Sequence, residues 1–153
     1  MNFVFQGTPY VFSESCLETL GTHRQRSCLS RETGGQLFAR FEQQRVLVDC
    51  ATLTRGKSKR SRFSFWPDRE AERRDIKALF DQGLHYIGDW HTHPEARPTP
   101  SRPDTVKMQE VFRQSVHELE VMLLVIVGQS EFPDGLYVGA VATGAVTQLK
   151  PVP

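Results

Sequence analysis

The sequence predicts an α/β domain of three layers, in which a mixed β-sheet is flanked by helices. Segments that alternate apolar and polar residues, or run continuously apolar, are interleaved with segments of helical periodicity. The chain has 153 residues, of which 39% are hydrophobic, and this is enough to bury the core of one domain. No low-complexity tract or internal repeat interrupts the pattern, so we expect a single domain over residues 1–153.

The first third of the chain predicts one helix and one β-hairpin. After a short apolar start, Ser13–Arg26 begins with a residue that can cap a helix and continues with apolar residues three to four positions apart. The alternating stretch Gly35–Phe41 and the apolar stretch Arg45–Leu53 follow. They predict two antiparallel strands joined by a short turn.

A basic run comes next. Arg55–Arg62 holds five Lys or Arg residues and no acid, and two interpretations stay open: a solvated loop, or an insertion that meets an acidic partner or steers a substrate tail. A short aromatic strand is expected at Phe63–Trp66, and a helix at Asp68–Asp81. The expected apolar stripe of this helix consists of Ala71, Ile76, Leu79 and Phe80.

The second half predicts one helix among several strands. Leu84–His93 alternates as a strand does, and four prolines in the next ten residues exclude a helix or a central strand until about Ser101. Ser101–Leu119 has helical periodicity, and its expected apolar side consists of Val106, Met108 or Val111, Phe112 and Val116. Further strands are expected at Glu120–Gly128, whose nearly continuous apolar run is typical of burial on both faces, and at Leu136–Ala142 and Ala145–Leu149.

Composition narrows the classes of partner. Nineteen Lys and Arg against eighteen Asp and Glu give no overall bias toward nucleic acid or a membrane surface. The longest apolar run, Val121–Val127, is far shorter than the roughly twenty residues that span a bilayer, and the N-terminus does not resemble a signal peptide. The spacing of Cys16, Cys28 and Cys50 fits neither a disulfide framework nor a metal knuckle, so we expect reduced thiols in a cytoplasmic protein.

Candidate metal ligands cluster after the predicted strand Leu84–His93. His91 and His93 are two residues apart, so both imidazoles point to the same face at the end of that strand. Two histidines and a carboxylate form a normal ligand set for a catalytic zinc ion, and Asp104 lies across the proline-rich loop. The sequence therefore predicts a zinc site made by His91, His93 and Asp104.

A structural interpretation competes for some of these residues. Ser101 and Asp104 have the spacing of a helix capping box, although Ser101 could cap the helix and still present its hydroxyl to a site. Asp89 falls on the face of the two histidines, either as a partner that orients an imidazole or as an ordinary aspartate. The other histidines are expected to be structural or exposed, namely His23, His85 and His117. No cysteine has a patterned histidine partner, which disfavours a cysteine protease, and no phosphate-binding glycine motif is present.

The order His91-x-His93, seven residues, Ser101, two residues, Asp104 resembles the JAMM (MPN-plus) motif of zinc-dependent isopeptidases. That motif also has an upstream glutamate beside the first hairpin, and Glu32, directly before Thr33-Gly34-Gly35, matches it. The resemblance covers nearly the whole chain and implies the three-layer JAMM fold, similar to that of cytidine deaminases, with a curved mixed sheet. It is strongest to stand-alone bacterial JAMM proteases, including those encoded beside ubiquitin-like conjugation enzymes in cyclic-oligonucleotide anti-phage (CBASS) operons.

The resemblance implies a role for each site residue. His91, His93 and Asp104 would hold Zn²⁺, which lowers the pKa of water toward neutrality. Glu32 would act as the general base and return the proton to the leaving lysine amine. Ser101 would donate a hydrogen bond to the tetrahedral oxyanion.

The implied substrate is a ubiquitin-like or otherwise conjugated protein whose extended C-terminal tail is joined by an amide to a lysine or small acceptor. Such conjugates are products of E1/E2-like machinery, and the tail is expected to add a strand to a sheet edge. Three alternatives stay open: trimming of a ubiquitin-like sulfur-carrier protein, a non-catalytic MPN scaffold, and a zinc deaminase. The intact ligand set argues against the scaffold, and the absence of a P-C-x-x-C signature argues against the deaminase. Substrate identity, isopeptide or peptide preference and oligomeric state do not follow from the sequence.

Overall fold

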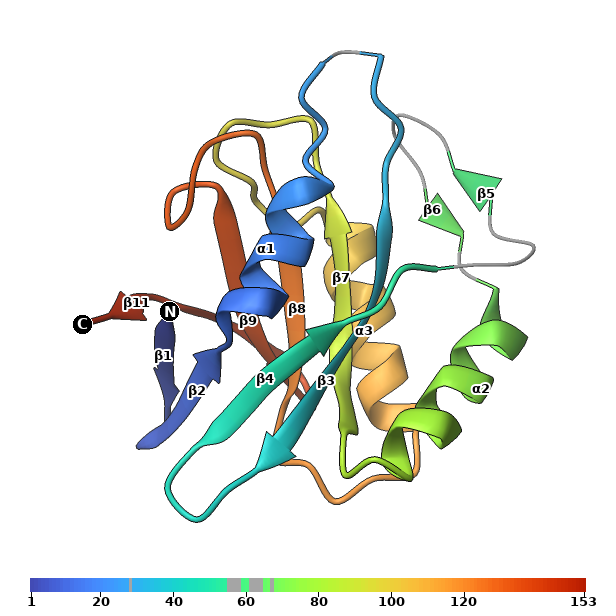
Figure 1. Ribbon diagram of the computed structural model, residues 1–153, viewed down its shortest axis with the longest axis vertical. Coiled ribbons are helices and arrows are strands. Elements are labelled where there is room, and N and C mark those ends of the chain that lie inside the picture. The colour runs from blue at the N-terminus through green and yellow to red at the C-terminus, as the bar shows by residue number, and fades with distance from the viewer. Residues whose placement is uncertain (28, 55–58, 61–64, 67) are drawn as a thin grey trace.

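The computed structural model describes residues 1–27, 29–54, 59–60, 65–66 and 68–153. Its elements in chain order are β1 Asn2–Phe5, β2 Thr8–Phe12, α1 Glu14–Thr22, β3 Gly34–Phe41, β4 Val46–Ala51, β5 Lys59–Arg60, β6 Phe65–Trp66, α2 Arg69–Phe80, β7 His85–Thr92, α3 Arg102–Gln114, β8 Met122–Val127, β9 Leu136–Ala142, β10 Ala145–Leu149 and β11 Pro151–Val152. Nine strands form one sheet in the order β10-β9-β8-β7-β3-β4-β2-β1-β11, and β5 and β6 form a separate hairpin (Figure 1).

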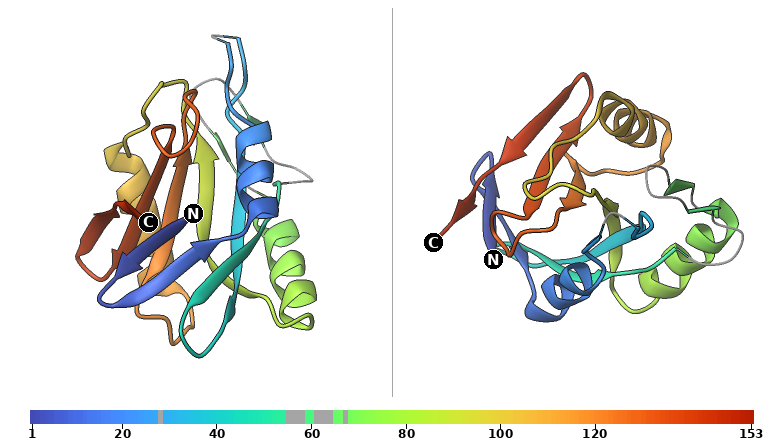
Figure 2. Two further views of the ribbon diagram at one scale, coloured as in Figure 1. Left: turned by 60° about the vertical axis from the view of Figure 1, so that its left-hand side comes forward. Right: turned by 90° about the horizontal axis from the view of Figure 1, so that it is seen from above.

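The sheet is mixed and strongly curved. The pairs β2–β4 and β7–β8 are parallel, and the other neighbouring pairs of the large sheet are antiparallel. Only Lys150 separates β10 from β11, so one extended C-terminal segment pairs first with β9 and then with β1. The two ends of the sheet therefore meet along this segment, and the view from above shows the sheet bending around on itself (Figure 2).

Two apolar clusters separate three layers. The larger one fills the concave side of the sheet, where α1 contributes Cys16 and Leu20 and β7 contributes Trp90. The smaller one lies on the opposite side, where Met108 of α3 packs on outward-facing residues of β8 and β9. α1 thus covers one face while α2 and α3 cover the other, as Figures 1 and 2 show, and the predicted three-layer α/β class is confirmed. β8 is buried on both faces, as its apolar run predicts.

Several element boundaries differ from the sequence-based expectation. The hairpin β1–β2 and the short strand β11 are absent from that expectation, because their alternation is brief and their pairing joins the two ends of the chain. α1 ends at Thr22 rather than Arg26, and beyond its end Arg24 pairs with Glu131 at 2.7 Å. α3 ends at Gln114 rather than Leu119.

The expected apolar stripes of two helices are partly wrong. On α2, Ala71 is buried as predicted, but Phe80 is 60% exposed and the second buried residue is Glu72, which pairs with Arg69. This helix lies on polar groups of β7, so its buried face is not purely apolar. On α3, Met108 is buried and Val106 is exposed, and Val116, also a member of the predicted stripe, is exposed beyond the end of the helix.

Other expectations concern the basic run and the cysteines. Within Arg55–Arg62, β5 is described, and the remaining positions lie outside the described residues, as does Cys28. Cys16 and Cys50 are both free. In the described part of the chain, no helix is long and apolar enough to cross a membrane.

Candidate metal centre

β7 presents different chemistry on its two faces. His91 lies beside Ile126 of β8, on the side covered by α3, while Trp90 and Thr92 face the α1 side. His93 follows the strand and continues its ladder, since its amide donates to Val127 O at 2.9 Å. The alternation of the strand therefore places the two imidazoles together, with ring centroids 4.9 Å apart.

The loop after β7 brings Asp104 to the histidines. Gly128 makes room for this loop, because a Cβ there would stand 2.6 Å from Glu95 O. The loop then enters α3 through the predicted capping box: Asp104 N donates to Ser101 Oγ at 3.3 Å, and Ser101 N donates to Asp104 Oδ2 at 2.8 Å. The cap fixes the Asp104 carboxylate at the start of the helix, facing the end of β7.

Three metal-binding side chains converge at this point. His91 Nε2 lies 3.1 Å from His93 Nε2 and 3.2 Å from Asp104 Oδ1, while His93 Nε2 lies 3.2 Å from Asp104 Oδ2. Ligand atoms at about 2.1 Å from a tetrahedral zinc ion are about 3.4 Å from one another, so these separations fit one shared ion. In the described ranges, no other group of three His, Cys, Asp or Glu residues is close enough to hold a metal.

The electrostatics of the cluster suit a cation. Burial lowers the pKa of His91, which favours the neutral imidazole that a metal needs. Burial also acts to lower the pKa of His93, but the hydrogen bond and charge of Asp104 outweigh it and raise that pKa. Burial acts to raise the pKa of Asp104, yet hydrogen bonds from both histidines hold it well below its usual range. The Asp104 carboxylate is therefore negatively charged, which favours binding of a cation by the cluster.

Glu32 lies close to the same cluster. Its side chain is 8% exposed, and it interacts electrostatically with His93, Asp104 and Lys107. Burial raises its pKa to about 7, close to the value that suits proton transfer near neutral pH. Gly35, the second glycine of the Thr33-Gly34-Gly35 run that follows Glu32, is required by a close backbone approach, because a Cβ there would stand 1.8 Å from Thr52 O. This glycine thus serves the packing of β3 against the segment that follows β4.

Ser101 stands at the entrance of the cluster with its hydroxyl oxygen used by the helix cap. Its side chain accepts the Asp104 amide, which leaves the hydroxyl hydrogen available as a donor. Ser101 is exposed, so a ligand can reach that hydrogen. The structure therefore brings together all five residues of the predicted site: His91, His93, Asp104, Glu32 and Ser101.

The remaining candidates lie outside this group. Asp89 accepts a hydrogen bond from Tyr86 Oη at 2.8 Å, rather than from an imidazole. His23 contacts Trp90 edge-on, His85 lies between two phenylalanine rings, and His117 packs on Phe112. The structural interpretation of these three histidines fits their packing.

Two buried polar residues at the site are missing from the sequence-based prediction. Gln25 is fully buried just after α1, and Thr92 is fully buried between the two histidines. The sequence does mark Thr92: it stands between two histidines on a strand, so its hydroxyl points to the face opposite the two imidazoles. Gln25 gave no signal, because one glutamine in an irregular segment has no periodicity.

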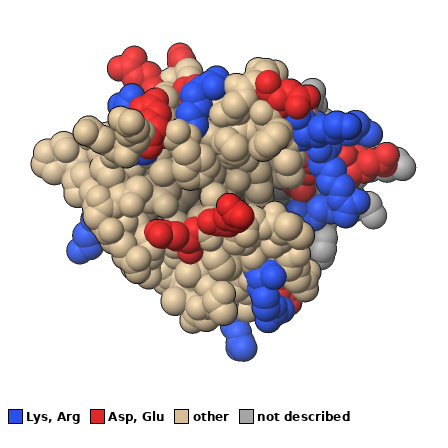
Figure 3. Space-filling model, turned by 90° about the horizontal axis from the view of Figure 1, so that it is seen from below, with Lys and Arg blue, Asp and Glu red and all other residues tan. Residues whose placement is uncertain are grey.

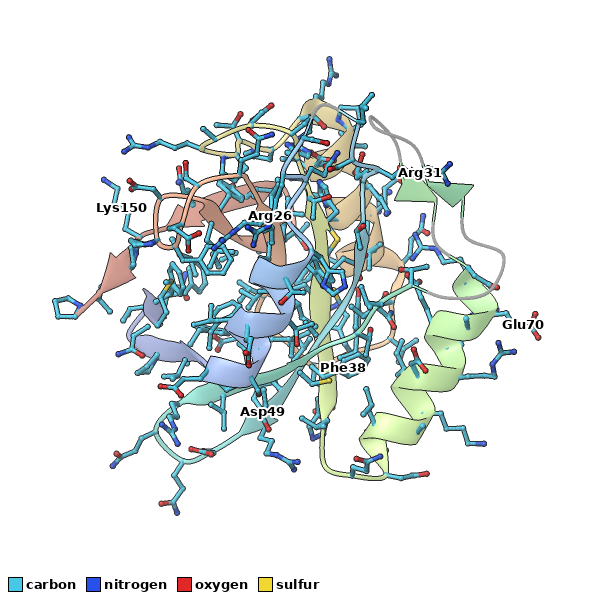
Figure 4. All side chains as sticks on the ribbon, turned by 45° about the horizontal axis from the view of Figure 1, so that its top comes forward. Arg26, Arg31, Phe38, Asp49, Glu70 and Lys150 are labelled. Carbon is cyan, nitrogen blue, oxygen red and sulfur yellow. The ribbon has the colours of Figure 1, made fainter. Side chains whose placement is uncertain are left out.

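The two ends of the molecule differ in surface chemistry. Arg26 and Arg31 lie at the end that carries the metal centre, in the segment that leads to Glu32 (Figure 4). The opposite end, seen from below, shows acidic side chains beside a hollow (Figure 3). That hollow is lined by Tyr10, Ile87, Glu118 and Glu120, among others, and none of the five site residues contributes to it.

Comparisons with known proteins agree with this geometry. The family profile described as "Prokaryotic homologs of the JAB domain" matches residues 13–136. A protein of Pseudomonas aeruginosa (strain BWHPSA011 / Pa011) named "CD-NTase/cGAS isopeptidase" is 33% identical over 124 residues, which cover 78% of this chain and 77% of that protein. A "Probable metalloprotease y4qB" of Sinorhizobium fredii (strain NBRC 101917 / NGR234) is 30% identical over 122 residues, covering 75% and 74% of the two chains.

A solved structure has the same fold. The solution structure of protein DSY2949 from Desulfitobacterium hafniense superposes with a TM-score of 0.62, covering 91% of this chain and 88% of that one. The two sequences are 17% identical, so this likeness concerns the fold alone.

Proposed function

Because the chain belongs to the prokaryotic JAB family, we propose that it is a zinc-dependent isopeptidase that cleaves the amide between the C-terminal residue of a conjugated protein and a lysine side chain. The observation that carries the proposal is the convergence of His91, His93 and Asp104, with Glu32 beside them. Isopeptidase and metalloprotease are the names of relatives at 33% and 30% identity, and both describe hydrolysis of an amide.

The proposed metal is zinc, held by two imidazole nitrogens and one carboxylate oxygen. These three side chains would hold the ion and, as in catalytic zinc sites, would leave it able to take a further ligand. When bound, the ion supplies Lewis acidity that lowers the pKa of water and polarises a carbonyl oxygen.

The chain's own residues handle the proton and the developing charge. The Glu32 carboxylate takes a proton from the attacking water while the water oxygen bonds to the scissile carbonyl carbon. The hydroxyl hydrogen of Ser101 donates to the oxyanion of the resulting tetrahedral carbon. Glu32 then gives its proton to the amide nitrogen as the C–N bond breaks, releasing a carboxylic acid and a lysine amine.

The proposed substrate is the conjugate of a CD-NTase-type nucleotidyltransferase, as in the name of the Pseudomonas aeruginosa relative, and this would place the protein in anti-phage defence in the cytoplasm. The same chemistry serves any conjugate with an extended C-terminal tail, including products of E1/E2-like enzymes. The end of β7 lies at one end of the molecule (Figure 1), and Ser101 beside the cluster is exposed, which supports access for such a tail.

The proposal is tested with a pair of labelled peptides. Both carry the last ten residues of a CD-NTase of this class; in one the C-terminal carboxyl is joined to a lysine Nε, and in the other to an α-amine. We expect zinc-loaded protein to cleave the first faster and to release an intact C-terminal carboxylate, and Glu32→Gln to cleave neither. Equal cleavage by Glu32→Gln, or cleavage that persists in metal-free protein, would contradict the proposal.

A further inference from the structure

A chain of buried hydrogen bonds connects the segment that carries Glu32 to the strand that carries the histidines. Thr33 N donates to Thr92 Oγ1 at 2.9 Å, and Thr92 Oγ1 in turn donates to Gln25 Oε1 at 2.8 Å. Gln25 Nε2 donates to Ser30 O at 3.1 Å. The segment is therefore held at Ser30 and at Thr33, and Glu32 lies between these two points.

The alternation of β7 explains how one strand serves two purposes. His91 and His93 face the α3 side, and Thr92 between them faces the α1 side, where Gln25 follows α1. The Thr92 amide also donates to Thr33 O at 2.8 Å, so two bonds join these residues. These bonds fix the segment that holds Glu32 directly against the strand that carries the histidines.

The burial of Gln25 and Thr92 makes the hydrogen bonds between them necessary for stability. Gln25 and Thr92 are both fully buried, where an amide or hydroxyl is stable only if its hydrogen bonds are made. The Thr92 hydroxyl uses its hydrogen and a lone pair, and Gln25 uses both side-chain polar atoms. The Gln25 carbonyl also accepts from Gln129 Nε2 at 2.9 Å, which joins the loop after β8 to the same network.

We propose that Gln25 and Thr92 are positioning residues, which hold Glu32 in register with the metal ligands without touching metal or substrate. This inference rests on the proposed function, in which Glu32 is the general base. It deepens that function by assigning the placement of the base to a buried network on the far side of β7.

The test uses Thr92→Val and Gln25→Met, which keep side-chain size and remove the hydrogen bonds. We expect kcat to fall about 10- to 100-fold with KM changed less than about twofold, because a misplaced base affects the chemical step rather than binding. Bound zinc should stay at one equivalent per chain, measured on the protein without substrate. The conservative Thr92→Ser, which keeps the hydroxyl, should restore kcat.

A second measurement is independent of activity. We expect the Thr33 amide to exchange with deuterium at least about tenfold faster in Thr92→Val and Gln25→Met than in wild type, because the first variant removes its acceptor and the second removes the hydrogen bond that holds that acceptor in place. The matched control is Thr52→Val. It removes a hydroxyl that accepts the Gln36 amide at 3.2 Å, and Gln36 lies on β3, outside the segment between Ser30 and Thr33 that holds Glu32. It should leave both kcat and Thr33 exchange unchanged.

The outcomes are distinguishable. Loss of zinc in Thr92→Val and Gln25→Met would show that the network supports the ligands rather than the base, and would overturn the inference. Turnover equal to that of Thr52→Val, despite faster Thr33 exchange, would also overturn it. If wild-type protein binds zinc but hydrolyses no conjugate, the proposed function fails, and Thr33 exchange alone then decides whether Gln25 and Thr92 anchor the segment.

Discussion

Two buried clusters of ionisable groups lie on β7, and they differ in how their charges are satisfied. In the cluster beneath α2, Arg69 Nη1 donates to Glu72 Oε2 at 2.8 Å and Tyr86 Oη donates to Asp89 Oδ1 at 2.8 Å. Each carboxylate there has a donor of its own within the protein. At the end of the strand, the Asp104 carboxylate instead faces two imidazole nitrogens and the Ser101 amide, and the two imidazole nitrogens also face each other.

The second cluster consists of lone-pair donors that face one another. His91 Nε2, His93 Nε2 and the Asp104 carboxylate meet within 3.2 Å, a distance at which lone pairs repel unless a proton or a cation lies between them. Burial of ionisable groups alone therefore does not mark a functional site. Convergence of several metal-binding atoms on one point does.

The largest expected effect comes from removing the charge of Asp104. In Asp104→Asn the amide oxygen can still cap α3, but the anionic ligand is lost, so we expect zinc affinity to fall at least about 100-fold and hydrolysis with it. Zinc binding is measured by competition with a chromophoric chelator. Asp134→Asn, which removes an exposed partner of Arg97, is the control and should bind zinc as wild type does. Unchanged zinc affinity in Asp104→Asn would remove this carboxylate from the ligand set.

Glu32→Gln separates chemistry from metal binding. We expect kcat to fall about 10²- to 10⁴-fold, because no base remains to take the proton from water, while bound zinc stays near one equivalent. Single-turnover kinetics and metal analysis on the same sample check both. Glu110→Gln, at an exposed position on α3, should change neither quantity. Turnover within tenfold of wild type would assign the base to another group.

Ser101→Ala tests whether the serine does more than cap α3. Loss of the cap costs about 1 kcal/mol of stability, whereas loss of a hydrogen bond to the oxyanion lowers kcat about 100-fold. Stability from urea unfolding and kcat from initial rates are compared in one variant. A stability loss of that size with unchanged kcat would leave Ser101 as a structural residue.

The pH dependence of stability of the metal-free protein reports on Glu32. Its pKa in the folded state is about 7 and that of the unfolded chain is near 4.5, so the folded protein holds this proton between the two values and loses stability as pH rises through them. Glu32→Gln removes this loss and should be more stable than wild type by on the order of 3 kcal/mol at pH 8, and no different at pH 4. The difference in unfolding free energy between the two proteins isolates Glu32 from the titration of the histidines. A pH-independent difference would contradict the burial of this carboxyl.

The smallest effect on function is expected for the cluster beneath α2. Asp89→Asn leaves the Tyr86 hydroxyl with an amide oxygen as its acceptor and should change stability by about 1 kcal/mol. Zinc content and kcat should stay within twofold of wild type, since Asp89 contacts no imidazole. Loss of zinc in Asp89→Asn would mean that the two clusters are one functional unit, which would contradict a purely structural role for the cluster beneath α2.

The sequence predicted those parts of the site whose geometry is local. His91 and His93 share a face because a strand has a period of two, and Ser101 and Asp104 share a helix start because a capping box has fixed spacing. Glu32 is predicted as a site residue only through the family resemblance. Its approach to His93 depends on the pairing of β3 with β7, which spacing along the chain does not encode. Gln25 was missed for the same reason, because its partner Thr92 is 67 positions away.

The missed and misjudged parts of the fold have a similar cause. The strands β1 and β11 pair across the length of the chain, and two- to four-residue strands carry too little alternation to predict. Helical periodicity places Phe80 in the core, but in the structure Glu72, paired with Arg69, takes a buried position on α2, while the Phe80 ring is exposed and contacts His85. Periodicity predicts which residues share a face and does not predict what that face meets.

The central claim is that the convergent cluster at the end of β7 is a catalytic zinc centre. Its most direct test is to strip the protein of metal, add zinc in substoichiometric steps and measure hydrolysis of the lysine-linked peptide at each step. For a catalytic zinc centre we expect a linear rise in rate that ends at one zinc per chain, with no activity before the first addition. A rate that is independent of zinc, or that continues to rise well beyond one equivalent, would contradict it.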